Sequence, residues 1–511
     1  MNRFGRCCVA AVNRISLLKN RFGQNYLSII KPYLISKVLT LNFQILVMNR
    51  NTLWSLRLGF SGKEAQKIET LGLQKFLEQS FATKVDKKEP DLLVDSPKTK
   101  AELKAARQLM KTTDDEDAVK KILRKEIQVS QKLKEWWLEK MMDEAFPLRE
   151  KMTCFWHNHF VSTYQKVKVN HWVFQHNQLL REQAFGNFKT LTKAVLKTNA
   201  MVRYLDNVDN RRDKINENLS RELLELFTLG IGNYTEEDIK NGAKGLAGLT
   251  IGETNANYRK LLENNDTITY FGKTGTFKAD ELVDIIFEQK AIPYFVTRKI
   301  LKWFLYDKPS EELVTYYGDY FRKVNFELQP LLTKIFTEEY QKNISGSKIK
   351  DPLVYILQLK YELKIEKMNT RVLTFFLKQQ GMDLFNQPNV KGWNGGNEWL
   401  SSQMYLQRNN VADLLCSGQP LNRRRKYMSD EMMDENSDTM LRVSIDFDAN
   451  GTNKTIIAQL SERVLFQTDD SMQKDFEELL KYDFNPKSEG AENAVLRLFN
   501  TMVKLPEFQL I

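Results

Sequence analysis

Apolar residues recur at every third or fourth position along most of this chain, a period that predicts α-helices rather than β-strands. The longest such stretch runs from about Ala101 to Ala145 and is rich in lysine and glutamate, which favour helix. Shorter stretches with the same period lie at residues 279–289, 293–306, about 310–380, 455–466, 472–480 and 491–503. We therefore expect an all-α fold, a large multi-helix, bundle-like body.

Local signals refine this pattern near its start and its middle. Ser61 and Glu64 have the spacing of an N-terminal capping box and predict a helix that runs toward Ala82. Residues 83–98 are charged and contain two prolines, so we expect an exposed insertion there. Polar sequence at 250–276 predicts at most a minor β-hairpin.

The segment NENLSRELLELFTL at 216–229 predicts an amphipathic helix. Its leucines fall on one stripe, whereas Glu217, Arg221 and Glu225 follow one another at i,i+4 spacing on another face. Gly230 follows directly and predicts the end of the helix.

The charge is distributed unevenly. The chain of 511 residues has a net charge of +11, but residues 1–47 contain seven Lys or Arg and no Asp or Glu. Subtracting these seven leaves only +4 for the rest, so the body has no global basic field and we do not expect a nucleic-acid partner. The basic run Arg423–Lys426 predicts instead an exposed insertion at 420–440.

The acid-free leader has the composition of a mitochondrial presequence, but we expect a simpler origin for it. Translation would start at Met48, residues 1–47 would not be part of the fold, and residues 48–511 would form a single large helical domain. The leader lacks the apolar core and cleavage site of a secretory signal, and no apolar run reaches the length of a membrane span. Without such signals the default location is cytoplasmic.

The four histidines, His157, His159, His171 and His176, lie within twenty residues of one another. Imidazole is a frequent metal ligand, so a metal site is one interpretation. Trp156 and Phe160 at i,i+4 favour a helix here, however, and helical positions 157 and 159 would face about 200° apart. We assign no metal ligand, and the alternative is histidines hydrogen-bonded in or near the core.

A second interpretation pairs His157 or His159 with the carboxylates and the guanidinium of Glu217, Arg221 and Glu222. A carboxylate beside an imidazole can orient it and tune its pKa for general acid or base catalysis. The alternative is a structural network between two packed helices, in which each polar group has a partner. Both interpretations stay open at this point.

Two glycine-containing segments offer weaker signals. FGKTGT at 271–276 resembles a phosphate-binding loop, but Thr267 stands where that motif needs its first glycine, so we expect a tight turn. GWNGG at 392–396 could line a ligand site with Trp393 and Trp399 as stacking surfaces, or form a structural loop with a Trp plug.

Four segments resemble the bacterial family called domain of unknown function 1800. They are LREKMTCFWHNHF at 148–160, NENLSRELLELFTLGIGNYTEEDI at 216–239, QPNVKGWNGGNEWL at 387–400 and LFNTMVKLPEFQL at 498–510. The resemblance implies a largely helical fold and no known activity. Many members of the family look exported, whereas this chain lacks a clear signal.

Two functions are consistent with the sequence. One is a non-catalytic binding or scaffolding protein, which we favour because no nucleophile motif or complete metal set is visible. The other is an enzyme, with a hydrolase and a metal-dependent enzyme as the options, and with His157, His159, Glu217, Arg221 and Glu222 at its site. Candidate ligand-binding residues are Trp156, Asn216, Asn218, Trp393 and Trp399. Substrate, cofactor and partner are left open.

Overall fold

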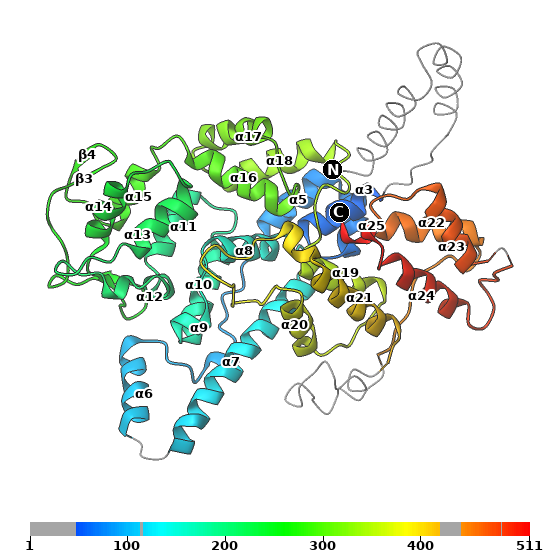
Figure 1. The fold of residues 1–511 in the computed structure, drawn as a ribbon, viewed down its shortest axis with the longest axis horizontal. Helices are drawn as coiled ribbons and strands as arrows, with labels where there is room; N and C mark the ends of the chain where they lie inside the picture. Colours follow the sequence, from blue (N-terminus) through cyan, green and yellow to red (C-terminus); the bar gives the residue numbers. More distant parts are fainter. Residues whose placement is uncertain (1–47, 113–115, 420–440, 482) are drawn as a thin grey trace, which may run out of the picture.

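The computed structural model describes residues 48–112, 116–419, 441–481 and 483–511 (Figure 1). The expected leader and the expected insertion at 420–440 lie outside the described residues. Helices dominate the described chain, and its strands form two small antiparallel pairs, so the all-α prediction is confirmed. In the part of the chain that the structure describes, no helix is long and apolar enough to cross a membrane.

The described part of the chain begins with four short helical elements. These are α3 (Arg50–Leu58), the 3₁₀ helix η2 (Gly62–Glu64), α4 (Ala65–Leu71) and α5 (Leu73–Ala82). The single helix expected over 61–82 is divided at Gly72, whose φ of 76° and ψ of 150° end α4. The expected capping box is also not formed. Ser61 accepts from the amide of Lys63, whereas the amide of Glu64 donates to the Ser55 hydroxyl.

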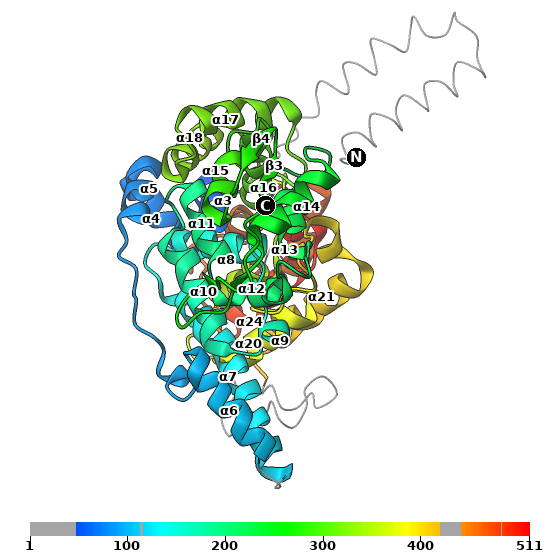
Figure 2. The ribbon, with the colours of Figure 1, turned by 90° about the vertical axis from the view of Figure 1, so that its left-hand side faces the viewer.

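A helical hairpin projects from the body (Figures 1 and 2). Its arms are α6 (Lys100–Thr112) and α7 (Glu116–Asp143), where the sequence predicts one long helix. The base of α7 is anchored by Trp137, which is buried and donates from its indole N–H to Glu150 at 2.9 Å.

The central helix α8 (Leu148–His159) lies between two hydrophobic cores and is buried on nearly all sides. Leu148, Met152 and Phe155 belong to the first core, whereas Cys154 belongs to the second. A helix with no solvated face is stabilised by packing all around it rather than by one amphipathic stripe. Its buried polar groups therefore need partners inside the protein.

The first core is enclosed mainly by the helices that follow α8, drawn in green in Figure 1. They are α10 (Asn170–Glu182), α11 (Phe188–Leu196), α12 (Asn199–Tyr204), η4 (Asn207–Asp209), α13 (Asn218–Glu222), η5 (Leu223–Thr228), α14 (Glu236–Leu246), α15 (Ala279–Ile286), α16 (Ile292–Phe304), α17 (Glu311–Lys323) and α18 (Leu328–Tyr340). The short helix α9 (Tyr164–Val167) packs instead on the second core. Thr235 and Asp238 form a capping box at the start of α14, where a threonine cap is expected.

The two strand pairs lie in this lobe. β1 (Leu249–Thr250) pairs with β2 (Asn257–Tyr258), and β3 (Ile268–Tyr270) pairs with β4 (Lys273–Gly275). Phe271 and Gly272 connect β3 and β4 with φ angles of 47° and 77°, as a tight two-residue hairpin turn requires. The FGKTGT segment is thus a turn.

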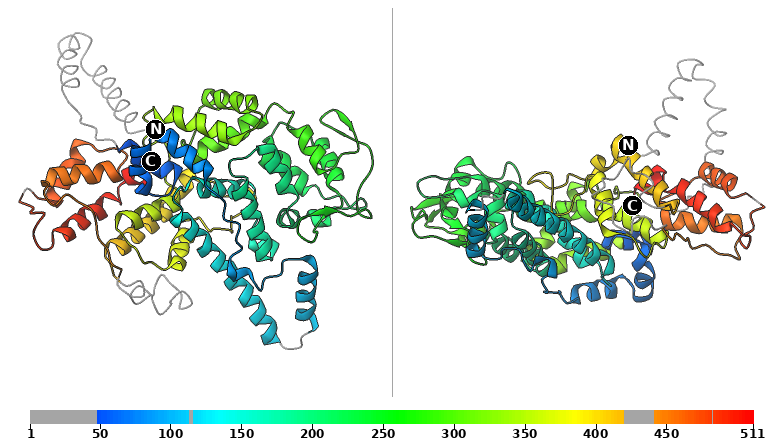
Figure 3. Two further views of the ribbon diagram at one scale, coloured as in Figure 1. Left: turned by 180° about the vertical axis from the view of Figure 1, so that it is seen from behind. Right: turned by 90° about the horizontal axis from the view of Figure 1, so that it is seen from below.

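The second core is enclosed mainly by α7 and by the C-terminal helices (Figure 3). These are α19 (Pro352–Glu362), α20 (Thr370–Gln379), η6 (Gly396–Leu400), α21 (Ser402–Cys416), α22 (Asn453–Val464), α23 (Asp470–Leu479), α24 (Ala491–Met502) and α25 (Pro506–Gln509). The loop between α20 and η6 returns to the end of α8 and carries the GWNGG sequence.

One buried guanidinium joins distant parts of the chain. Arg57 of α3 donates to the carbonyls of Phe304 at 2.9 Å and Leu305 at the end of α16, to Ile344 at 3.2 Å, and to Ile511 at 2.7 Å. It is 1% exposed, and burial lowers the pKa of its side chain to about 9. Carbonyl oxygens rather than carboxylates satisfy this cation.

Candidate functional site

A π-helix forms the floor of the candidate site. The helix that starts as α13 widens at η5, so the sequence prediction of one regular α-helix over 216–229 is only partly met. The amides of Leu229 and Gly230 both donate to the carbonyl of Leu224. In a regular α-helix the amide of Gly230 would bind Leu226, so the Leu226 carbonyl is free for another donor. Single π-turns inside α-helices occur often at functional sites.

Two side chains occupy the carbonyls of this π-turn. Lys299 of α16 donates from Nζ to the Leu226 carbonyl at 2.8 Å, and His159 Nε2 lies 3.0 Å from the Phe227 carbonyl. Lys299 Nζ also lies 3.2 Å from His159 Nδ1. Because the Phe227 carbonyl can only accept, His159 carries its proton on Nε2 and accepts from Lys299 at Nδ1.

The surroundings of Lys299 disfavour its charged form. Burial, and next the charge of Lys302, lower the pKa of Lys299 to about 7. The Phe295 ring, 4.7 Å from Nζ, is a contact that favours the ammonium form, but no ion pair between Lys299 and a carboxylate occurs among the described residues. Lys299 is nevertheless partly exposed.

His159 is neutral in the folded protein. Burial, and then the charge of Lys299, hold the pKa of His159 well below its usual value. With both ring nitrogens engaged, the imidazole cannot turn, so it fixes the position of the Lys299 amine.

The GWNGG loop closes over the end of α8 through Asn158. The side-chain oxygen Oδ1 of Asn158 accepts from the Trp393 amide at 2.7 Å. Gly392 has a φ of 80°, and a Cβ atom there would lie 2.3 Å from that same oxygen. A glycine is therefore required both by the backbone conformation and by the close approach. Lys302 donates to the Asn394 carbonyl at 3.3 Å, which joins the loop to α16.

His157 and His176 are in the core, away from this site. His157 is 0% exposed, and its Nε2 lies 2.9 Å from the Ser162 carbonyl. His176 is equally buried, with Nε2 2.7 Å from the Phe160 carbonyl. Burial lowers the pKa of His157 to about 3 and that of His176 to about 4.

The three charged residues proposed from sequence, Glu217, Arg221 and Glu222, do not form one cluster. Arg221 pairs with Glu217 at 3.2 Å and with Glu236 at 2.9 Å on the surface of α13 and α14. Glu225, the last member of the expected ladder, accepts instead from the Tyr234 hydroxyl at 3.1 Å. Glu222 is partly exposed, and burial followed by the charge of Glu225 raises its pKa. These contacts join none of the three to His157 or His159.

Most of the candidate ligand-binding residues are buried or form hydrogen bonds within the protein. Trp156 is 0% exposed and donates to the Ala184 carbonyl at 3.2 Å, and Trp393 and Trp399 are each 6% exposed. Asn216 is partly exposed and accepts from the Asn218 amide at 3.0 Å. Among the residues with a described placement, no group of three or more His, Cys, Asp or Glu is arranged to hold a metal ion.

Lys299 is the residue that sequence reasoning missed. Phe295, Lys299 and Trp303 share one face of α16 at i,i+4 spacing, so a lysine interrupts an otherwise aromatic stripe. A cation on the apolar face of a helix is a signal, but it identifies no partner. The π-turn that supplies its acceptor gives no comparable signal in the sequence.

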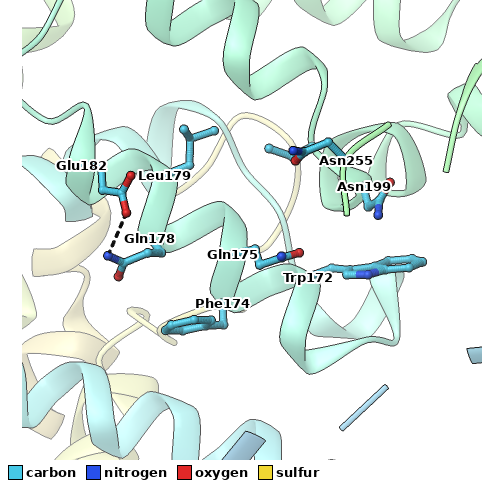
Figure 4. Close-up of a pocket in the computed structure, with 9 residues that line it drawn as sticks. Trp172, Phe174, Gln175, Gln178, Leu179, Glu182, Asn199 and Asn255 are labelled. Carbon is cyan, nitrogen blue, oxygen red and sulfur yellow. Dashed lines mark hydrogen bonds between the residues drawn. The ribbon is translucent and has the colours of Figure 1, made fainter. Parts of the chain in front are cut away.

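A separate pocket of about 200 Å³ lies along α10 (Figure 4). Trp172, Gln175 and Glu182 contribute to its lining from α10, and Asn199 and Asn255 contribute from the facing segments. Asn199 binds the carbonyls of Gly252 and Thr254, both at 3.2 Å, so it fixes the wall of the pocket. The lining contains no histidine, and the pocket is distinct from the Lys299 site.

Comparison with known proteins identifies a family but no activity. The model of the family described as "Protein of unknown function (DUF1800)" matches residues 52–510. No curated protein and no solved structure matches the chain significantly.

Proposed function

Since the chain belongs to the DUF1800 family, whose function is unknown, we propose a function from the site itself: an enzyme that uses the Lys299 amine as a nucleophile toward the carbonyl carbon of an aldehyde or ketone. The observation that carries the proposal is the position of that amine and its hydrogen-bond partners. Lys299 Nζ contacts the Leu226 carbonyl of the π-turn and His159 Nδ1, and among the described residues it forms no ion pair with a carboxylate.

The chemistry follows from the hydrogen bonds. A neutral amine has two hydrogens, and at this site they go to the Leu226 carbonyl and to His159 Nδ1. The nitrogen lone pair then points along a remaining tetrahedral direction. With a pKa near 7, about half of the amine is neutral at pH 7, whereas an ordinary lysine is almost fully charged. Desolvated lysines are activated for Schiff-base formation in this way.

The proposed step is balanced without a cofactor. The nitrogen lone pair attacks the carbonyl carbon, and one of the two nitrogen hydrogens then passes as a proton to the carbonyl oxygen, which gives a neutral carbinolamine. Loss of water then leaves a carbon–nitrogen double bond to Lys299. His159 is a positioning residue in this scheme, because its low pKa prevents it from holding a proton at neutral pH.

Reductive trapping tests the proposal. The chain is incubated with acetaldehyde and cyanoborohydride at pH 7, and modified lysines are quantified by peptide mass spectrometry. We expect Lys299 to be modified at least about tenfold faster than the exposed Lys302, three residues along α16, because burial lowers the pKa of Lys299 to about 7. His159→Phe, which removes the Nδ1 acceptor, should lower the rate at Lys299 but not at Lys302. Equal rates at Lys299 and Lys302 in the unaltered chain would contradict the proposal.

A non-catalytic binding or scaffolding role is the second candidate, and the projecting hairpin favours it. Leu109 of α6 and Leu123 and Ile127 of α7 are 58%, 51% and 61% exposed. Figures 1 and 3 show the ribbons of α6 and α7 diverging from the tip of the hairpin. We infer that an amphipathic helix of a partner protein would lie against them.

Site-specific photo-crosslinking in the source cells tests this role. A photoreactive residue at Leu123 or Ile127 should give one discrete crosslinked product, and the same group at the exposed Arg124 of the same helix should not. Products of equal yield at all three positions, or none at any, would count against a partner on this surface.

A further inference from the structure

A second cavity lies where four elements meet, remote in sequence from α16. It has a volume of about 220 Å³ between the η2 turn, the end of α7, the start of α8 and α19. Its apolar lining consists of Phe60, Met141, Met142, Pro147 and Leu357. Methionine side chains adapt to ligands of different shape, so these walls suit an aliphatic chain.

Glu64 brings a buried carboxyl group to the wall of this cavity. The residue is 3% exposed. Its nearest described side-chain donor is the Ser55 hydroxyl at 3.3 Å, but the single hydrogen of that hydroxyl goes to the Ser61 carbonyl at 2.6 Å. The Glu64 carboxyl therefore has no strong side-chain donor for a negative charge. Burial raises the pKa of Glu64 to about 7.

The charged groups around the cavity are mostly cationic. Lys63 and Lys360 belong to its lining. Lys63 donates to the Met142 carbonyl at 3.2 Å and Lys67 donates to the Ala145 carbonyl at 2.5 Å, and the charges of both partly offset the effect of burial on the pKa of Glu64. Burial lowers the pKa of Lys360, whereas the charge of Asp143 raises it.

The acidic neighbour on α19 is already neutralised. Glu362 accepts from Arg463 at 2.9 Å. Tyr361, which also lines the cavity, is 44% exposed and lies at its opening to solvent. Below pH 7 the cavity thus combines two lysines with a neutral Glu64, a positive balance that favours an anionic ligand.

We propose that this cavity binds a small monocarboxylate with an unbranched aliphatic tail. The carboxylate lies between Lys63 and Lys360 and accepts a hydrogen bond from the protonated Glu64. The tail lies among Phe60, Met141 and Met142. This site is independent of the Lys299 chemistry, because no element of it carries that amine.

Calorimetric titration of the full chain with hexanoate, hexanol and hexylamine tests the site. We expect saturable binding of hexanoate at pH 6, at least tenfold weaker binding of hexanol, and none of hexylamine. Lys360→Met should weaken hexanoate binding at least about tenfold. Lys67→Met removes an equal charge outside the lining and is the matched control, so its affinity at pH 6 should stay within about threefold.

The pH dependence of hexanoate binding distinguishes the proposed carboxylate site from binding through the aliphatic tail alone. Between pH 6 and pH 8 the neutral fraction of Glu64 falls about tenfold, so hexanoate affinity should fall by about the same factor. The Glu64→Gln variant cannot ionise and should show no such fall. No hexanoate binding at 10 mM, preferential binding of hexylamine, or the same pH dependence in both proteins would overturn the proposal.

Discussion

At the scale of single residues, the buried histidines show how little a residue type says about its role. His157 and His159 are two positions apart on α8, and the expected opposite orientation sends them into different environments. His157 contacts Trp137 and Phe385 in the second core, whereas His159 contacts Phe227 in the first. Only His159 meets a group that solvent can reach.

The depressed pKa of His157 predicts acid sensitivity. An unfolded histidine binds a proton near pH 6.5, but folded His157 does so only near pH 3. Its contribution to the free energy of unfolding is therefore complete above pH 6.5 and is lost as the pH falls toward 3, by up to about 1.4 kcal/mol per pH unit. Urea unfolding at pH 7.5 and 5.0 should show a smaller acid loss in His157→Gln, by about 2 kcal/mol. An unchanged pH dependence in the variant would contradict this assignment.

Lys299 marks the limit of sequence reasoning at this scale. Its anomalous place on an aromatic face of α16 is visible in the sequence, but its acceptors come from residues 73 and 140 positions away. Pairings of that kind depend on tertiary packing, which periodicity does not encode.

At the scale of elements, periodicity predicts that helices form but not where they break. The stretch at 216–229 reads as one amphipathic helix, and the chain does form a helix there. The π-turn within it shifts the register, so Leu226 is partly exposed while Leu223 and Leu229 are buried. The division at Gly72 comes from a glycine with a φ of 76°, a local conformation that the apolar period does not reveal.

The GWNGG loop offers a test of how an element is held. Gly392→Ala places a methyl group against Asn158, whereas Gly232→Ala meets no atom within 4 Å at a similar φ of 87°. The control should lose about 1 kcal/mol of unfolding free energy from backbone strain, and Gly392→Ala about 2 kcal/mol more. Urea unfolding measures both losses, and hydrogen exchange at the Trp393 amide should accelerate only in Gly392→Ala. Equal losses would show that Asn158 does not constrain the loop.

At the scale of the whole molecule, the fold class and the family could be predicted from the sequence. The contacts that join α3 to α16 and to the C-terminal segment could not. Arg57 lies in a short helix of mixed polar and apolar residues, and apart from the Ser347 hydroxyl its acceptors are backbone carbonyls, which any residue provides. Sequence spacing therefore gave no indication of the junction among α3, α16 and the C-terminal segment.

Replacing Arg57 should lower the free energy of unfolding of the protein, because its contacts join α3, α16 and the C-terminal segment. Arg57→Met keeps the apolar stem but leaves several buried carbonyls without a donor, at about 1–3 kcal/mol for each. We expect a loss of at least 3 kcal/mol in urea unfolding. Arg57→Lys restores the charge but not the planar fork, so it should recover only part of the loss. Full recovery with lysine would show that charge, not geometry, is what the junction needs.

The same junction has a consequence for synthesis on the ribosome. Arg57 and the Ile511 carbonyl are 454 positions apart, so α3 is made long before its last partner exists. At translation rates of roughly 5–20 residues per second, the interval is about 20–90 s. During that time the apolar surface of Trp54, Leu56 and Leu58 has no complete site to enter. We therefore expect nascent α3 to bind chaperones that hold unfinished chains, and codon changes that slow the ribosome after this helix to lengthen its exposure.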